Sequence, residues 1–128
     1  MENPADLKYT ETHEWVRLNP DGTVTLGITD HAQAALGDMV YVELPASGRS
    51  LARGDAFVVV ESTKAASDVY APIAGEVVAT NDTLGDAPQR INEDPFGAGW
   101  LVKIKPADPA ELDALLSVVD YTAGPGAA

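Results

Sequence analysis

Residues 58–72 of the chain read Val58-Val59-Val60-Glu61-Ser62-Thr63-Lys64-Ala65-Ala66-Ser67-Asp68-Val69-Tyr70-Ala71-Pro72. Two arms with β-branched and aromatic residues, which favour strands, flank a turn of small side chains. Lys64 falls at the tip of this predicted hairpin and is the only lysine between Tyr9 and Val102. A lysine in that position presents its amine to solvent, where a modifying enzyme can reach it. By itself the pattern is also typical of an ordinary solvated turn.

Short strands are predicted on both sides of this hairpin, because Gly and Pro recur between runs rich in Val and Ile from Pro20 to Gly99. Glu14–Leu18 and Thr23–Ile28 flank the segment 19–22, Asn-Pro-Asp-Gly, whose Pro and Gly suit a tight turn. The other predicted strands cover 39–44, 57–61, 67–70, 75–80 and 100–105. The pattern therefore predicts a mainly β domain.

Two helices are expected beside the strands. Asp30 can cap a short helix that runs through Leu36, with Gln33 three residues after the cap and Gly37 as its stop. A C-terminal helix is predicted to start at Asp108, which is followed by a proline at the first helical position. One face of that helix is predicted to pack onto the sheets through Leu112, Leu115, Leu116 and Val119. The tail, residues 124–128, is expected to be disordered.

The composition limits both size and function. With 128 residues, 45% of them hydrophobic, the chain suits one domain, 1–128. A formal net charge of −12 repels nucleic acid and anionic membrane surfaces, so neither is expected as a partner. The chain has no cysteine, so any sulfur chemistry must come from a cofactor. Without a membrane-length apolar run or a targeting segment, the expected location is the cytoplasm, or the mitochondrial matrix for a processed organellar protein.

No pattern typical of a catalytic or metal site stands out. The stretch 13–17, His-Glu-Trp-Val-Arg, begins like a zinc-protease motif, but Arg17 takes the place of the second histidine. His31 is the only other histidine, so both histidines are expected to be structural or surface residues. Phosphate-binding glycine loops and nucleophile elbows are also missing. The sequence thus predicts no active site and no metal site.

A series of motifs covers nearly the whole chain. They are Leu7-Lys8-Tyr9, His13-Glu14-Trp15-Val16, Gly27-Ile28-Thr29-Asp30-His31-Ala32-Gln33, Leu36-Gly37-Asp38, Val40-Tyr41-Val42-Glu43-Leu44-Pro45, Glu61-Ser62, Lys64-Ala65-Ala66-Ser67-Asp68-Val69-Tyr70-Ala71-Pro72, Gly75-Glu76-Val77, Asn92-Glu93-Asp94-Pro95-Phe96-Gly97 and Gly99-Trp100-Leu101. In this order they resemble a known family, the lipoyl carrier or H proteins of the glycine cleavage system. Thr63 departs from the family, which usually has Val before the lysine; because both are β-branched, we expect the turn to tolerate it.

The resemblance implies a barrel-sandwich hybrid of the lipoyl/biotinyl type, with lipoate joined to Lys64 by an amide. It implies a non-catalytic carrier that takes the aminomethyl group of glycine from a pyridoxal-phosphate-dependent glycine decarboxylase to a tetrahydrofolate-dependent aminomethyltransferase. Dihydrolipoyl dehydrogenase, which reoxidises the carrier, and a lipoate-attaching enzyme are the other implied partners of an expected monomer. By the same resemblance Thr12, Glu14 and Asp68 contact the parked arm, with the carboxylates favouring its ammonium; alternatively, they are ordinary surface polar residues.

Other functions stay open at this point. A biotinyl domain shares the hairpin but normally places methionines beside the modified lysine, where this chain has Thr63 and Ala65. The lipoyl domain of an acyltransferase is a second carrier of the same class. An enzyme with a carboxylate or metal site is a third alternative, and a structural or binding β domain whose lysine is never modified is a fourth. The intact mass of the protein separates the lipoyl and biotinyl adducts.

Overall fold

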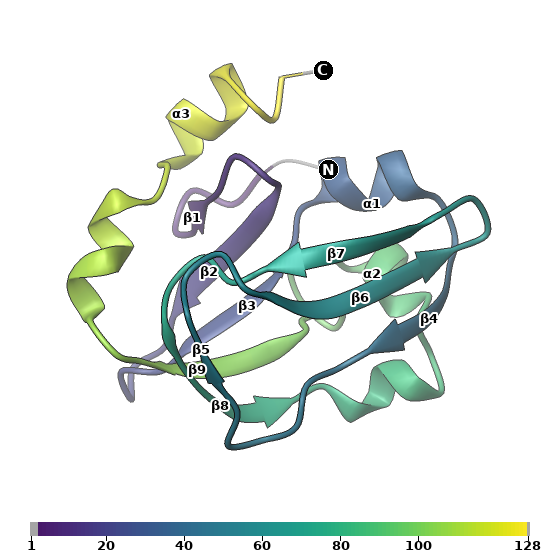
Figure 1. Ribbon diagram of the computed structural model, residues 1–128. Helices are drawn as coiled ribbons and strands as arrows, with labels where there is room; N and C mark the ends of the chain where they lie inside the picture. Colours follow the sequence, from purple (N-terminus) through teal and green to yellow (C-terminus); the bar gives the residue numbers. More distant parts are fainter. Residues whose placement is uncertain (1–2, 128) are drawn as a thin grey trace.

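The computed structural model describes residues 3–127, which are organised mainly as strands (Figure 1). The strands are β1 (Lys8–Tyr9), β2 (Glu14–Leu18), β3 (Val24–Ile28), β4 (Met39–Glu43), β5 (Ser50–Leu51), β6 (Ala56–Ser62), β7 (Ala66–Tyr70), β8 (Gly75–Thr80) and β9 (Val102–Pro106). The α-helices are α1 (Asp30–Leu36), α2 (Arg90–Glu93) and α3 (Val118–Ala123), and the 3-10 helices are η1 (Asp82–Gly85) and η2 (Pro109–Ala114). Each predicted strand is present, with ends shifted by two residues at most.

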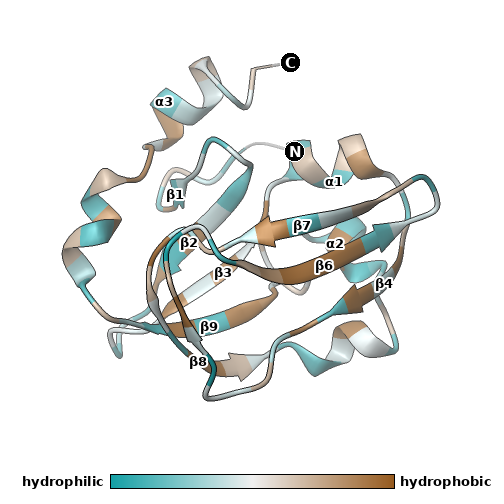
Figure 2. Ribbon diagram, in the orientation of Figure 1, coloured by the Kyte–Doolittle hydropathy of each residue, from teal (hydrophilic) through white to brown (hydrophobic). Residues whose placement is uncertain are grey.

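The strands form two sheets around one core. The larger sheet has the order β1-β2-β3-β9-β8-β5, and the smaller one has the order β4-β6-β7. Side chains from both sheets fill the space between them, including Leu26, Val60 and Ile104, which are almost fully buried. The hydrophobic stretch of β6 in Figure 2 is part of this filling. The arrangement confirms the predicted mainly β fold.

The hairpin of β2 and β3 confirms the turn expected at residues 19–22. The backbone N–H of Gly22 donates to the Asn19 carbonyl over 3.0 Å, and the Asn19 N–H donates to the Thr23 carbonyl over 2.8 Å. The carboxylate of Asp21 accepts from both the backbone and the hydroxyl of Thr23. Gly22 has φ +88°, a conformation that side chains rarely adopt, so glycine is required there.

The N-cap of α1 lies one residue earlier than the sequence predicted. Thr29, not Asp30, is the N-cap, and its hydroxyl accepts from the Ala32 backbone N–H over 3.3 Å. Asp30 is the first helical residue and accepts from the Gln33 side chain over 2.8 Å. The prediction favoured the carboxylate as a cap, but a hydroxyl serves equally well. The stop at Gly37 is confirmed, because its φ is +88°.

The predicted C-terminal helix starts where expected but does not continue. Asp108 caps η2 through a hydrogen bond from the Ala110 N–H over 3.0 Å. The helix stops at Ala114, because Leu115 is extended and Leu116 pairs with Tyr9 as an isolated bridge, with N–O distances of 2.9 and 2.8 Å. A new helix, α3, then starts after its cap, Ser117.

This break corrects the predicted apolar face. Leu112 and Leu115 do pack against the main core, whereas Leu116 packs with a second cluster. Val119, the last residue of the predicted stripe, is 71% exposed. Pairing with Tyr9 satisfies the backbone N–H and carbonyl of Leu116. This tertiary contact therefore prevails over the helical spacing of the apolar residues in the sequence.

The second cluster anchors both ends of the described chain. Tyr9 and Tyr121 stack with their ring centroids 4.7 Å apart, and Trp15 lies fully buried beside them. The indole N–H of Trp15 donates to the Pro95 carbonyl over 2.9 Å. The cluster therefore fixes the segment between β1 and β2, which becomes important for the site.

The last residues remain only partly described. In the segment 124–127, the Gly126 N–H donates to the Tyr121 carbonyl over 2.8 Å. Residue 128 lies outside the described residues, and disorder of the tail stays a prediction. Across residues 3–127, no helix has the length and apolar character that crossing a membrane requires.

Candidate functional site

The tip of the β6–β7 hairpin presents Lys64. Ser62 closes the turn: its backbone N–H donates to the Ala65 carbonyl over 2.8 Å, and its hydroxyl accepts from the backbone N–H groups of Lys64 and Ala65, both over 3.1 Å. Residues 63–66 are all exposed, as is the Lys64 side chain. The backbone is therefore fixed while the amine is accessible, which is what attachment of a pendant group by an amide requires.

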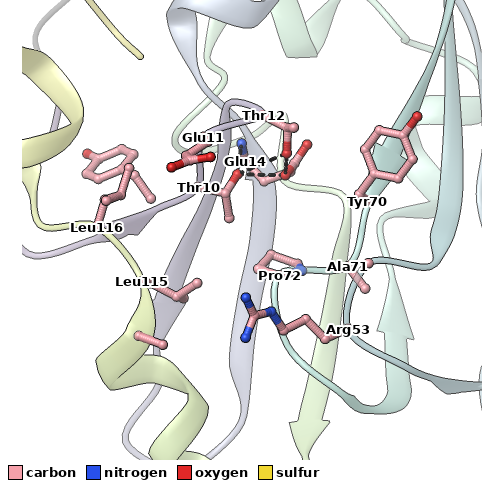
Figure 3. Close-up of a pocket in the computed structure, with 13 residues that line it drawn as sticks. Thr10, Glu11, Thr12, Glu14, Arg53, Tyr70, Ala71, Pro72, Leu115 and Leu116 are labelled. Carbon is pink, nitrogen blue, oxygen red and sulfur yellow. Dashed lines mark hydrogen bonds between the residues drawn. The ribbon is translucent and has the colours of Figure 1, made fainter. Parts of the chain in front are cut away.

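A pocket of about 460 Å³ lies beyond the far end of β7 (Figure 3). Its wall combines the segment between β1 and β2, the end of β7, the turn at Arg53 and the residues between η2 and α3. Its lining residues are Tyr9, Thr10, Glu11, Thr12, Glu14, Arg53, Gly54, Tyr70, Ala71, Pro72, Ala114, Leu115 and Leu116. The pocket is thus assembled from four separate parts of the chain.

Glu14 is the charged group with the most unusual environment in this pocket. Its side chain is only 3% exposed. One carboxylate oxygen accepts from the hydroxyls of Thr10 and Thr12, over 2.6 and 2.5 Å. Burial raises the pKa of Glu14, and the hydrogen bonds from Thr10, Thr12 and the Tyr70 backbone oppose that rise in part. A buried carboxylate of this kind is suited to hold a cation that enters the pocket.

The structure brings together two of the three predicted arm contacts. Thr12 and Glu14 share a hydrogen bond and the same pocket. Asp68 is exposed on β7, where it pairs with Val59, and it lines a separate hollow of about 190 Å³. Asp68 therefore lies between the Lys64 tip and the end of its strand rather than beside Glu14.

Thr10 and Tyr70 are pocket residues that the sequence analysis missed. Thr10 donates to Glu14 through its hydroxyl and also accepts from the Glu14 backbone N–H over 3.0 Å. The spacing of Thr10, Thr12 and Glu14 gave no signal of this, because residues 11–13 form a turn, in which the His13 N–H donates to the Thr10 carbonyl over 3.2 Å, and this turn brings both hydroxyls to the Glu14 carboxylate. Tyr70 lies across the pocket from Leu115 and Leu116 (Figure 3), and its backbone hydrogen-bonds to Glu14, so only the sheet could place it there.

The two histidines pack together outside this pocket. Their rings stack with centroids 4.3 Å apart, and Nδ1 of His13 lies 2.7 Å from the Tyr121 hydroxyl. Burial, and to a smaller extent the neighbouring His31, lowers the pKa of His13. His13 also has φ +69°, an uncommon value for a residue other than glycine. Within residues 3–127, no group of three or more His, Cys, Asp or Glu side chains could hold a metal ion.

Comparisons with known proteins agree with one another. Residues 7–124 match the family profile described as glycine cleavage H-protein. The glycine cleavage system H protein of Neisseria meningitidis serogroup C is 63% identical over 118 residues, which cover 92% of each chain. That of Thiobacillus denitrificans is 60% identical over 121 residues, covering 94% of this chain and 93% of the relative. The crystal structure of a glycine cleavage system H protein from Mycobacterium marinum superposes with a TM-score of 0.88 at 41% identity, covering 97% of this chain and 99% of that one.

Proposed function

The chain belongs to the glycine cleavage H-protein family, and from this premise we propose that it is a non-catalytic carrier with lipoate attached to Lys64. The observation that carries the proposal is the exposed lysine on a closed, rigid turn. When bound, the lipoyl group would supply a thiol–disulfide couple, which a chain without cysteine cannot provide.

The proposed carrier takes the aminomethyl group of glycine from glycine decarboxylase to the aminomethyltransferase, and dihydrolipoyl dehydrogenase restores it for the next cycle. A lipoate-attaching enzyme is the fourth proposed partner. Anchoring the group on one lysine raises its effective concentration at each partner's site without a permanent complex. The cytoplasm is the proposed location, in keeping with relatives that come from bacteria.

The residues of the pocket fit a sheltering role within this function. Glu14 presents a desolvated carboxylate, Thr10 and Thr12 hold its orientation, and Leu115 and Leu116 supply apolar side chains to one wall. An arm that ends in an ammonium group would find a counter-charge there. We include Thr12 and Glu14 as arm contacts in the proposal, and Asp68 as a contact nearer the tip.

Mass spectrometry of the protein purified from its native host tests the attachment. The expected result is an intact mass increased by one lipoyl group, with the modified peptide containing Lys64. A biotinyl increment at the same lysine would instead support a biotin carrier. An unmodified chain from a host that makes lipoate would support a structural or binding domain. Catalytic turnover by the unmodified chain would support an enzyme.

A further inference from the structure

The side chain of Lys64 lies against Gly37 instead of extending freely from the tip. A Cβ atom built on Gly37 would stand 3.1 Å from Cε of Lys64 and 3.8 Å from its Nζ. The backbone of Gly37 has φ +88° and ψ −161°, a combination essentially confined to glycine. Glycine therefore does two things here: it permits this backbone at the end of α1 and leaves space for the lysine stem.

The neighbouring residue contacts the same tip through the backbone. The N–H of Thr63 donates to the carbonyl of Asp38 over 3.0 Å. Gly37 and Asp38, which we call the seat, thus contact both the turn and the stem of the lysine that follows it. The tip is held by the turn between α1 and β4 as well as by its own hydrogen bonds.

Asn92, from α2, fixes the seat on both sides. Its amide nitrogen donates to the Gly37 carbonyl and to the Gln33 side chain, both over 2.9 Å. Its amide oxygen accepts from the Met39 N–H, also over 2.9 Å. One side chain therefore connects α1, the residue before Asp38 and the residue after it.

We propose that Asn92 and Gly37 are positioning residues that set the direction in which Lys64 offers its amine to the lipoate-attaching enzyme. This proposal rests on the function proposed above and deepens it. Asn92 hydrogen-bonds to Gly37, to Met39 and to Gln33 of α1, so it acts on the lysine through Gly37 and Asp38. Displacing a reacting group by about 1 Å can slow a reaction by up to about 100-fold. Contacts that hold the Lys64 stem in one direction are therefore expected to raise the rate of lipoylation.

The substitution Asn92→Asp tests this with little change in shape. It keeps the acceptor for Met39 but places an oxygen opposite the Gly37 carbonyl and Gln33 Oε1. Asn81→Asp is the matched control, since Asn81 also makes three side-chain hydrogen bonds, to the carbonyls of Ala98 and Trp100 and from the hydroxyl of Thr83, none of them in the seat or the tip.

Lipoylation of the apo chain is measured with the purified attaching enzyme, at a temperature where circular dichroism shows both variants folded. We expect Asn92→Asp to lower kcat/KM about tenfold or more and Asn81→Asp to leave it within about twofold, although both lower the melting temperature. Equal kcat/KM values for the two variants would overturn the proposal, because a purely structural role affects both alike.

A second pair of variants, together with a structural measurement, distinguishes failure of the positioning proposal from failure of the proposed function. The kcat/KM of lipoylation is measured for Gly37→Ala and for its control Gly22→Ala. Both glycines have φ +88°, but a Cβ built on Gly22 has no atom within 4 Å, whereas one built on Gly37 meets the Lys64 stem. We therefore expect Gly37→Ala to lower kcat/KM more than Gly22→Ala does. In nuclear Overhauser spectra of the apo wild type, we expect contacts between the Gly37 α protons and the Lys64 ε protons, and we expect Asn92→Asp to weaken them. Absence of these contacts in the wild type would refute the seat. Contacts present in a wild type that the enzyme does not lipoylate would refute the proposed function instead.

Discussion

The Lys64 tip and the Glu14 pocket lie at the two ends of β7 and have opposite environments. Tyr70 follows Lys64 by six positions, and the extended part of this stretch, Ala66–Tyr70, spans about 13 Å. The tip consists of small exposed residues closed by Ser62, whereas the pocket contains a buried carboxyl whose pKa is raised by burial. Presentation to several partners requires exposure, and protection from water requires desolvation. Under the proposed function, the carrier needs both environments within reach of one arm.

The largest expected effect comes from removing the attachment point. Lys64→Arg keeps the charge but cannot form the lipoyl amide, so glycine cleavage in the reconstituted system should fall to background. The melting temperature should stay unchanged, because the side chain is exposed. Lys8→Arg, at an exposed lysine on β1, is the control and should run normally. Normal activity of Lys64→Arg would place the attachment elsewhere.

The second prediction tests whether the pocket holds a charged arm. Glu14→Gln should shorten the half-life of the carrier loaded with the aminomethyl group about tenfold, because it removes a desolvated counter-charge. Asp68→Asn should change it by about twofold or less, since an exposed carboxylate is screened by solvent. The decay is followed by intact mass. Equal half-lives for the two variants would remove the distinction between the buried and the exposed carboxylate.

Salt should weaken encounters with partner enzymes but should hardly affect protection in the Glu14 pocket. Raising the ionic strength from about 0.01 M to about 0.15 M shortens the Debye length from about 30 Å to about 8 Å. We expect kcat/KM with the partner enzymes to fall several-fold, because the net charge of −12 steers the carrier to basic surfaces. The half-life of the loaded carrier should change little, since its charge contact is buried. Salt-independent kcat/KM would exclude electrostatic steering.

The smallest effect concerns stability. Because burial raises the pKa of Glu14 above its ordinary 4.5, the folded chain binds a proton in a pH window where the unfolded chain does not. Wild-type stability should therefore fall as pH rises from 4.5 through the raised pKa. Glu14→Gln cannot ionise, so it should melt a few degrees higher than the wild type at pH 7 and alike below pH 4.5. Thermal melts across this range give the difference, and a constant offset would contradict it.

The sequence was sufficient to predict those features of the fold that depend on residues adjacent in the chain. The turn at 19–22, the Lys64 turn and the glycine stop at residue 37 depend on neighbours in sequence, and all three are confirmed. The helix cap was misplaced by one residue, because Thr29 and Asp30 are both good caps and adjacent.

The remaining features depend on contacts between distant segments. Leu116 leaves the helical pattern because Tyr9, more than 100 positions earlier, offers a strand pairing. The two-residue strands β1 and β5 are too short to show a pattern. The pocket joins four parts of the chain, so no spacing within one part could predict that Arg53 and Tyr70 share it with Glu14.

The Tyr9–Leu116 bridge has a consequence for synthesis. All residues of the lysine hairpin precede position 71, whereas Leu115 and Leu116, which form one wall of the pocket, are synthesised later. A nascent chain therefore contains the Lys64 hairpin before it contains this wall of the pocket. A chain truncated before residue 115 would keep Lys64 but would lack this wall of the pocket, and under the proposed function it would expose the attached group to water.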